Sequence, residues 1–156
     1  MKVDQRERVS KIFCEVMEKF AFMFGELTPK EDLLQTPSTY VRASMTFDGE
    51  LAGRMTLIVP EALCAVIAAN VLGIEPDDAL VAARALDALK EILNITCGHV
   101  VTDLVGEQPV FELSIPVVSK LDEGEWPSSL ENPDSLVFLF DDNPVLLQFT
   151  VSNNEC

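Results

Sequence analysis

The sequence predicts an α+β fold in which helices pack on an antiparallel β-sheet. Two stretches, 3–26 and 76–105, repeat apolar residues at the three- and four-residue spacing of a helix. Two pairs of apolar or alternating runs enclose short turn signals, as is typical of β-hairpins. Helix, connection and hairpin follow in this order twice, at about 3–59 and 76–151, so the fold is expected to be pseudo-duplicated.

Length and composition favour a single globular domain spanning 1–156. The chain is 48% hydrophobic and 24% charged, which argues against disorder. The formal net charge is −15, from 26 acidic and 11 basic residues. Nucleic acids and anionic membrane surfaces are bound by clustered Lys and Arg, so neither is expected as a partner.

Three features indicate a cytoplasmic protein. The N-terminal residues are charged throughout and lack the apolar core of a signal peptide. The most apolar run, 63–73, is too short to span a bilayer. No two cysteines have C-x-x-C spacing, which predicts reduced and mostly buried thiols. The four cysteines are Cys14, Cys64, Cys97 and Cys156.

The first half of the chain reads as helix, connection, hairpin and helix. Residues 3–26 form the first helix, and Pro29 lies in the polar connection that follows. A hairpin is expected over 39–47 and 50–59, joined by Asp48-Gly49, with one face exposed to solvent. The apolar stripe of the helix consists of Val9, Phe13, Val16, Phe20, Met23 and Phe24. The solvent-exposed face of the hairpin is expected to consist of Tyr40, Arg42, Ser44 and Thr46.

Two helices follow this hairpin. Pro60 and Gly73 bound a short helix that is apolar on most sides and is therefore expected to be buried. A long helix runs from about Pro76 to Val105 and ends at Gly106. Its expected core line is Leu86, Leu89, Leu93, Cys97, Val100 and Leu104.

The last third predicts a strand, a loop and a second hairpin. Pro116 within the strand 109–118 indicates an edge position or a strand end. The polar loop 119–134 contains Trp126, which is expected to fold back onto the core. The second hairpin comprises 135–141 and 145–151, with its turn at 142–144, and the tail 152–156 is uninformative.

A polar line on the long helix is the candidate functional site. Asp87, Glu91, Asn94 and Gly98 follow one another at offsets of four, three and four, which stacks them on one outer face. Asn is a mediocre helix former and mid-helix Gly costs about 1 kcal/mol against Ala, so the helix sacrifices stability here. Glu91 can pair with a cation, Asn94 can orient a water, and Gly98 leaves room for another backbone.

The line alone is an incomplete active site. His99 is the only histidine, which excludes most metal and Ser-His or Cys-His schemes, and no phosphate-binding glycine motif is present. No cofactor is therefore expected. A polar stripe on an amphipathic helix is ordinarily a solvated face. Inserted into a partner that supplies metal, phosphate and Lys, however, it could complete a hydrolytic site by positioning water.

These residues resemble the signature of the CheC/CheX/FliY family of chemotaxis phosphatases. That signature is an acidic or small polar residue, three residues, Glu, two residues, Asn, and a Pro a little over twenty residues later. Asp87, Glu91 and Asn94 fit the spacing, Pro116 falls at or within about one residue of its place, and Gly98 completes E-x-x-N-x-x-x-G. The repeated layout extends the resemblance over nearly the whole chain and implies a CheC-like fold.

The resemblance implies a phosphorylated CheY-like response regulator as substrate. Asn94 would orient the attacking water, Glu91 would pair with the regulator's Lys, and Mg²⁺ would belong to the regulator. Glu15, Glu18 and Phe22 of the first copy align with Glu91, Asn94 and Gly98, so that copy lacks the Asn. This implies the single-site CheX-like branch, whose members dimerise. His99 stands where many relatives have Asn.

Two other interpretations stay open at this point. The same face could belong to a non-catalytic module that binds a response regulator or a flagellar switch component. The chain could also be a stand-alone dimeric scaffold of unknown role. The intact pair of Glu91 and Asn94 favours the enzyme, because a pure binder has no need of a mid-helix Asn.

Overall fold

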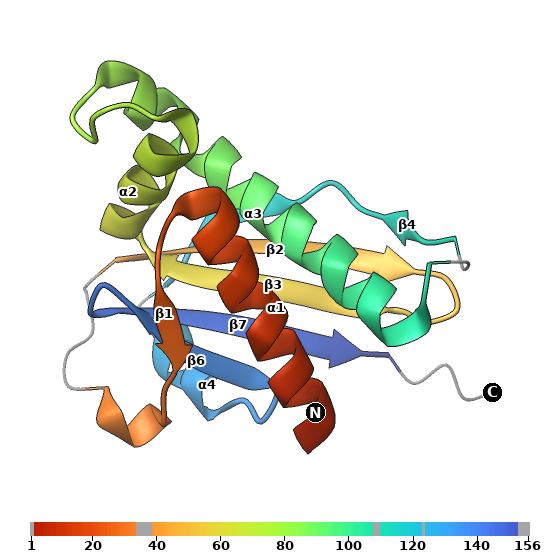
Figure 1. Ribbon diagram of the computed structural model, residues 1–156. Helices are drawn as coiled ribbons and strands as arrows, with labels where there is room; N and C mark the ends of the chain where they lie inside the picture. The colour runs from red at the N-terminus through yellow and green to blue at the C-terminus, as the bar shows by residue number, and fades with distance from the viewer. Residues whose placement is uncertain (1, 34–38, 108–109, 123, 153–156) are drawn as a thin grey trace.

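The computed structural model describes residues 2–33, 39–107, 110–122 and 124–152, which form one antiparallel sheet with helices on both faces (Figure 1). The helices are α1 (Val3–Ala21), α2 (Glu61–Leu72), α3 (Ala79–Val105) and α4 (Glu125–Glu131), with a short 3₁₀ helix η1 (Lys30–Asp32). The strands are β1 (Gly25–Leu27), β2 (Tyr40–Asp48), β3 (Gly53–Pro60), β4 (Glu112–Leu113), β5 (Val117–Lys120), β6 (Ser135–Phe140) and β7 (Asn143–Val151). The predicted α+β class is confirmed.

The two hairpins meet at the centre of the sheet. The strand order is β1-β6-β7-β3-β2-β4, with β5 also paired to β2. Hairpin β2–β3 joins hairpin β6–β7 through the β3–β7 pair. The strand after α1 pairs with β6, and the strands after α3 pair with β2. Each long helix is thus followed by a strand that extends the other hairpin, and the two halves of the sheet are arranged alike.

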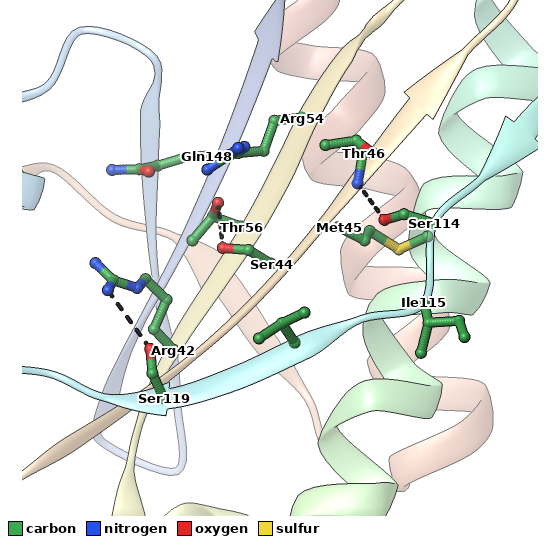
Figure 2. Close-up of a pocket in the computed structure, with 11 residues that line it drawn as sticks. Arg42, Ser44, Met45, Thr46, Arg54, Thr56, Ser114, Ile115, Ser119 and Gln148 are labelled. Carbon is green, nitrogen blue, oxygen red and sulfur yellow. Dashed lines mark hydrogen bonds between the residues drawn. The ribbon is translucent and has the colours of Figure 1, made fainter.

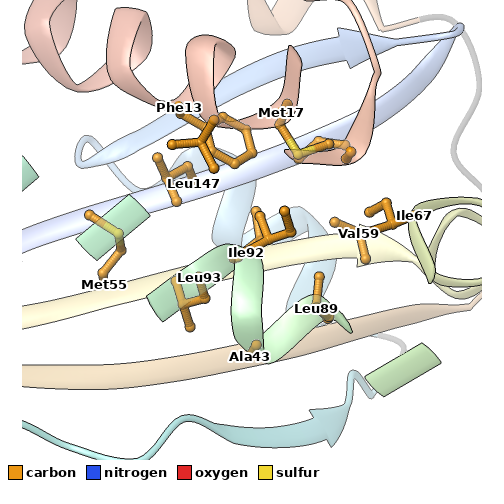
Figure 3. Close-up of a cluster of buried hydrophobic side chains, with 14 of the residues drawn as sticks. Phe13, Met17, Ala43, Met55, Val59, Ile67, Leu89, Ile92, Leu93 and Leu147 are labelled. Atoms are coloured by element: carbon orange, nitrogen blue, oxygen red, sulfur yellow. The ribbon is translucent and has the colours of Figure 1, made fainter. Parts of the chain in front are cut away.

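The main core lies between the sheet and the layer formed by α1 and α3 (Figure 3). Phe13 and Met17 of α1 and Leu89 and Leu93 of α3 meet apolar side chains such as Leu147 from the sheet, and all are at most 1% exposed. Full burial of one such side chain contributes about 1.5–3 kcal/mol to folding. Because side chains alternate along strands, the opposite face carries a second, smaller cluster beneath α4.

The first helix is shorter than predicted. It ends at Ala21 because Phe22 adopts a left-handed conformation with φ 54°, and the amide of Met23 donates to the carbonyl of Met17. The chain then forms β1 rather than a further helical turn, and β1 pairs with β6. Phe24, part of the apolar stripe expected in the core or at a subunit interface, is 70% exposed as a result.

Both hairpins are present, with shifted turns. Phe47 pairs with Gly53, so the first connection is longer than Asp48-Gly49. Phe140 pairs with Asn143, which moves the second turn to Asp141 and Asp142. These two residues have φ of 49° and 64°, the left-handed values that a two-residue hairpin turn requires.

The predicted strand 109–118 is two short strands, β4 and β5, separated by residues 114–116. Both pair with β2 at the sheet edge, as the prediction from Pro116 requires. The preceding Pro109 lies outside the described residues, as do 34–38 of the predicted connection and 153–156 of the tail.

The predicted loop 119–134 contains helix α4. Trp126 in α4 is 5% exposed, so its predicted burial is confirmed. Its ring stacks on that of Tyr40, with centroids 4.0 Å apart. Tyr40 was expected on the solvent-exposed face of the first hairpin and is instead 4% exposed beneath α4.

Helix α2 is buried on one side rather than on most sides. Its exposed apolar residues are Val71 and Leu72, which are 39% and 40% exposed, and its buried residues are Leu63, Cys64, Ile67, Ala68 and Ala69.

The free thiols of the described chain are those of Cys14, Cys64 and Cys97. Burial raises the pKa of Cys64 and of Cys97 to about 12, so neither is a reactive thiolate near neutral pH.

Candidate functional site

Helix α3 carries the candidate residues across the sheet. It begins at Ala79, later than the predicted Pro76, because Asp78 caps it by accepting a hydrogen bond from the amide of Leu80 at 2.9 Å. It ends before Gly106, which has φ 90°. The body of the helix packs on α1, α2 and the sheet, which makes it a rigid support.

The predicted core line of α3 is right in its middle and wrong at its ends. Leu89, Leu93, Cys97 and Val100 are fully buried over the sheet. Leu104 is only partly buried, and Leu86 is 47% exposed. The first half of α3 lies beside α2, and Leu86 lines a cavity there instead of entering the core.

The four predicted residues lie on the outer face of α3. Asp87, Glu91 and Asn94 are exposed, and Gly98 is half-buried. At about 100° per residue all four fall within a sector of about 60°, turned away from the sheet. Within the described part of the chain, neither the Glu91 nor the Asn94 side chain has a hydrogen bond or ion pair. Their polar groups are therefore available to a partner.

Gly98 leaves an open space next to Asn94. A Cβ built at this position would meet no described atom within 4 Å, apart from the helix's own backbone and the chain neighbours. No packing contact with the described residues thus requires a glycine here. The missing side chain is consistent with close approach by another molecule.

The C-terminal half of α3 is linked to α1 by an ion pair. The guanidinium of Arg8 donates to the Asp103 carboxylate and to its backbone carbonyl, both at 2.8 Å. The Arg8 and Asp103 side chains are 42% and 41% exposed, so the ion pair contributes at most about 1 kcal/mol. Buried Thr96 donates to the carbonyl of Ile92 at 2.8 Å and leaves no unsatisfied hydroxyl inside the helix.

The aligned positions on α1 do not form a second line of this kind. Glu15 and Glu18 are exposed on α1. Phe22, which aligns with Gly98, lies beyond the helix end and is 66% exposed. The candidate site is therefore confined to α3.

His99 and Pro116, the other residues singled out in the sequence, lie outside the polar line. His99 is exposed and lines a cavity of about 390 Å³ between α1 and α3, with Ile12, Thr102 and Asp103. Pro116 lies in the break between β4 and β5.

Among the described residues, no group of three or more His, Cys, Asp or Glu side chains could hold a metal ion. None of the helices in the described ranges is long and apolar enough to cross a bilayer.

A cavity on another side of α3 from the polar line was missed by the sequence reasoning. It measures about 450 Å³ and lies between α2, the first half of α3 and the edge strand β5. Ala65, Ala82 and Ala85 form part of its wall. These small residues fit any helix pattern, so the sequence offers no distinct signal for the cavity.

Solved structures with the same architecture define the fold. A CheC-like superfamily protein from Shewanella sp. PV-4 matches with a TM-score of 0.58 and 17% identity, covering 98% of this chain and 100% of that one. A CheX chemotaxis protein from Desulfovibrio desulfuricans matches with a TM-score of 0.70 and 12% identity, covering 96% and 100%. Helices on an antiparallel sheet in this order are thus the fold of CheC-like chemotaxis proteins.

The family follows from the sequence match. The family model described as chemotaxis phosphatase CheX matches residues 41–140, which is more than half of the chain and includes all of α3. The chain belongs to the CheX family, within the CheC/CheX/FliY superfamily of chemotaxis phosphatases. A CheX from Borrelia burgdorferi, solved in complex with CheY, BeF3 and Mg²⁺, has a TM-score of 0.63 and 16% identity, covering 97% and 100%. None of the curated proteins matches the chain.

Proposed function

We propose that this chain hydrolyses the aspartyl phosphate of a CheY-like response regulator. One observation carries the proposal. In a member of the CheX family, Glu91 and Asn94 stand one helical turn apart on the exposed face of α3, without polar partners among the described residues. A carboxylate and a carboxamide in this arrangement can enter a partner's active site together.

Asn94 would position the attacking water. Its amide oxygen accepts a hydrogen bond from the water and its NH2 group donates one, so the water's orientation is set without a change in charge. The water oxygen attacks phosphorus in line with the aspartate oxygen. The new P–O bond forms as the bond to the aspartate breaks, which releases inorganic phosphate and restores the carboxylate. Positioning supplies most of the catalysis in such a reaction.

Glu91 would fix the docked geometry by accepting hydrogen bonds from the regulator's active-site Lys. Asp87 and Gly98 would support docking, Asp87 as a further carboxylate on the same face and Gly98 through the space beside it. We place the Mg²⁺ in the regulator and assign no cofactor to this chain. The Borrelia CheX complex with CheY, BeF3 and Mg²⁺ supports a regulator as the partner.

Phosphate release from each CheY-like regulator of the host, measured with and without the protein, tests this function. The wild-type chain is expected to accelerate release from at least one regulator. Asn94→Ala should lower kcat by about 100-fold or more, because the water loses its fixed position. Glu91→Gln should mainly raise KM, since it removes the charge that pairs with Lys.

The controls separate catalysis from binding. Asn94→Ala should bind a beryllofluoride-activated regulator nearly as well as the wild type does, with an unchanged circular dichroism spectrum. Unaltered acceleration by Asn94→Ala would contradict the mechanism. Regulator binding without any acceleration by the wild type would instead identify a non-catalytic binding module.

We further propose a homodimer in the cytoplasm. The edge formed by β4, β5 and the break between them exposes Ile115 and Val117, which are 84% and 67% exposed. A second copy covering this edge would remove apolar surface from water and pair free strand groups. The free thiols of Cys14, Cys64 and Cys97 support a reducing compartment.

A further inference from the structure

A polar groove of about 570 Å³ crosses the face of the sheet opposite to α1 and α3 (Figure 2). Ser44 of β2, Thr56 of β3 and Gln148 of β7 are direct pairing partners and form one row across the groove. Met45 and Met55, which neighbour this row along the strands, are buried in the core beneath the two long helices. Because side chains alternate along a strand, the row lies on the other face of the sheet, away from the candidate site on α3.

The groove is lined by positive charge, although the chain as a whole is strongly acidic. Arg42 and Arg54 line it, and no Asp or Glu of the described residues does. Arg42 forms an ion pair with Glu125 of α4, which lies outside the lining. Arg54 is exposed and has neither a hydrogen bond nor an ion pair with a described residue. In a chain of net charge −15, the groove therefore offers an unpaired cation to a negatively charged group.

Hydroxyl groups next to Arg54 add hydrogen-bond donors. The Ser44 and Thr56 oxygens are 3.0 Å apart, so one hydroxyl donates to the other. The accepting hydroxyl keeps its own hydrogen, for which the described residues supply no acceptor. Thr56 is only 5% exposed, which places this pair at the base of the groove. Arg54 precedes Thr56 by two residues on the same face of β3, about 7 Å along the strand and within reach of a guanidinium.

Two serines at the side of the groove also have uncommitted hydrogens. The Ser114 hydroxyl oxygen accepts a hydrogen bond from the amide of Thr46 at 2.8 Å. The Ser119 hydroxyl oxygen accepts one from the Arg42 guanidinium at 3.5 Å. Neither hydroxyl donates to a described residue. The lining thus presents several free donors and, among the described residues, no carboxylate.

This combination favours a small oxyanion as the occupant. An open face of an antiparallel sheet is ordinarily a solvated surface, and solvated surfaces carry charges of both signs. An arginine among hydroxyl donors instead matches an oxyanion, because the guanidinium binds two oxygens through parallel N–H groups and hydroxyls donate to the others. The volume falls in the range of small-molecule sites, about 300–1,000 Å³. Large polyanions are disfavoured, since the net charge of the chain repels them.

We propose that the groove binds a phosphate group, free or esterified to a small molecule, between Arg54 and the Ser44–Thr56 pair. A phosphate has three strong acceptor oxygens and so uses more of these donors than a carboxylate, which has two. The site lies across the sheet from Glu91 and Asn94. The inference therefore does not depend on the proposed function.

Calorimetric titration of the full chain with inorganic phosphate, AMP and glucose 6-phosphate tests the proposal, with adenosine as the phosphate-free control. Arg54→Gln removes the unpaired cation, and Thr56→Val removes a hydroxyl with little change in shape. Arg84→Gln is the matched control, because Arg84 is also exposed and without a described partner but lies on α3. Urea unfolding and circular dichroism verify that each variant is folded.

The wild type is expected to bind at least one phosphate probe and not adenosine. Arg54→Gln should raise Kd about tenfold or more, because charge-assisted hydrogen bonds are lost, and Thr56→Val should raise it severalfold. Arg84→Gln should stay within about twofold of the wild type. Arg54 is exposed, so its variant decides the question even if Thr56→Val does not fold. No binding at millimolar concentrations, or an unchanged Kd in Arg54→Gln, would overturn the proposal.

Further outcomes identify the source of the phosphate and its position. Equal affinity for all three phosphate probes would support a site for inorganic phosphate, and tighter binding of an ester would support a site that also holds the organic part. Amide chemical shifts on titration should change in β2, β3 and residues 114–119. Changes confined to α3 would overturn the proposal. So would a shifted monomer–dimer equilibrium in Arg54→Gln with unchanged phosphate affinity, because the occupant would then be a second copy of the chain.

Discussion

Gly98 and Asn94 both weaken the helix that carries them. Intrinsic helix propensity disfavours Gly by about 1 kcal/mol relative to Ala, and Asn prefers caps and turns. Neither residue is explained by packing: Asn94 is exposed, and a Cβ at position 98 would meet no described atom within 4 Å outside its local backbone. We attribute both to the partner rather than to the fold.

Replacing Gly98 should separate stability from function. Gly98→Ala is expected to raise the free energy of unfolding by about 0.5–1 kcal/mol, because the helix gains propensity without a clash. Gly98→Leu should fold equally well but lower phosphatase activity through a higher KM, because its side chain occupies the space left for the partner. Urea unfolding and phosphate release measure the two effects. Full activity in Gly98→Leu would show that this space is not used.

Short elements decide which parts of the sheet are covered. Helix α4 packs against the face opposite to α1 and α3, through the stacked rings of Trp126 and Tyr40. Arg42 of β2 forms an ion pair with Glu125 of α4 (2.5 Å) and donates to Ser119 of β5 at 3.5 Å. Beyond this ion pair, the α4 side of the sheet carries an open polar groove of about 570 Å³. Ser44, Thr56 and Gln148 are among the residues that line it (Figure 2).

The Arg42–Glu125 pair predicts a pH-dependent stability for α4. The backbone amide of Asp122 and the Arg42 guanidinium lower the pKa of the Glu125 carboxyl below its usual 4.5. A carboxylate whose pKa is lower in the folded state stabilises that state above the unfolded pKa. This contribution disappears as the pH falls through the folded value.

Glu125→Gln should therefore be less stable than the wild type near neutral pH, with the difference vanishing below the lowered pKa. Urea unfolding at about pH 7 and at a series of lower pH values, followed by fluorescence, measures this. Trp126 is the only tryptophan of the chain and lies in α4, so the signal reports on this element directly. A difference in stability that does not shrink anywhere in the series as the pH falls would contradict the role of the charge.

The sheet as a whole ends in an edge that nothing in the described chain covers. β4 and β5 pair with β2 on one side only, and Val110, Ile115 and Val117 are 86%, 84% and 67% exposed along this segment. Exposed apolar edges of this kind are used for association. The proposed homodimer is assigned to this edge.

Charges placed on the edge should dissociate the proposed dimer. The double variant Ile115→Lys, Val117→Lys is expected to sediment as a monomer at concentrations where the wild type is a dimer, because a buried unpaired charge is costly. Val3→Lys is the control, since Val3 is 75% exposed at the start of α1. Sedimentation velocity over a range of concentrations measures the equilibrium. A monomeric wild type, or a double variant that still dimerises, would rule out this interface.

Local periodicity was sufficient for the larger elements. Apolar spacing predicted α3 and the body of α1, and turn residues located both hairpins, because these patterns depend on neighbours within a few residues. The outer position of Asp87, Glu91, Asn94 and Gly98 follows from the same helical period. The candidate line could therefore be read from the sequence, whereas its catalytic role is a proposal that needs the partner.

Long-range contacts decided what the sequence left open. The first helix stops at Ala21 because β1 is needed to pair with β6, more than 100 residues later, and no pattern within 3–26 indicates that pairing. Helix α4 forms in a polar stretch because Trp126 gains a partner in Tyr40. The cavity lined by Leu86 arises only when α2, α3 and β5 meet. The sequence by itself thus determined the class of fold and the polar line, since both are local in origin, and only the tertiary structure decided the element ends and the cavities, which depend on distant segments packing together.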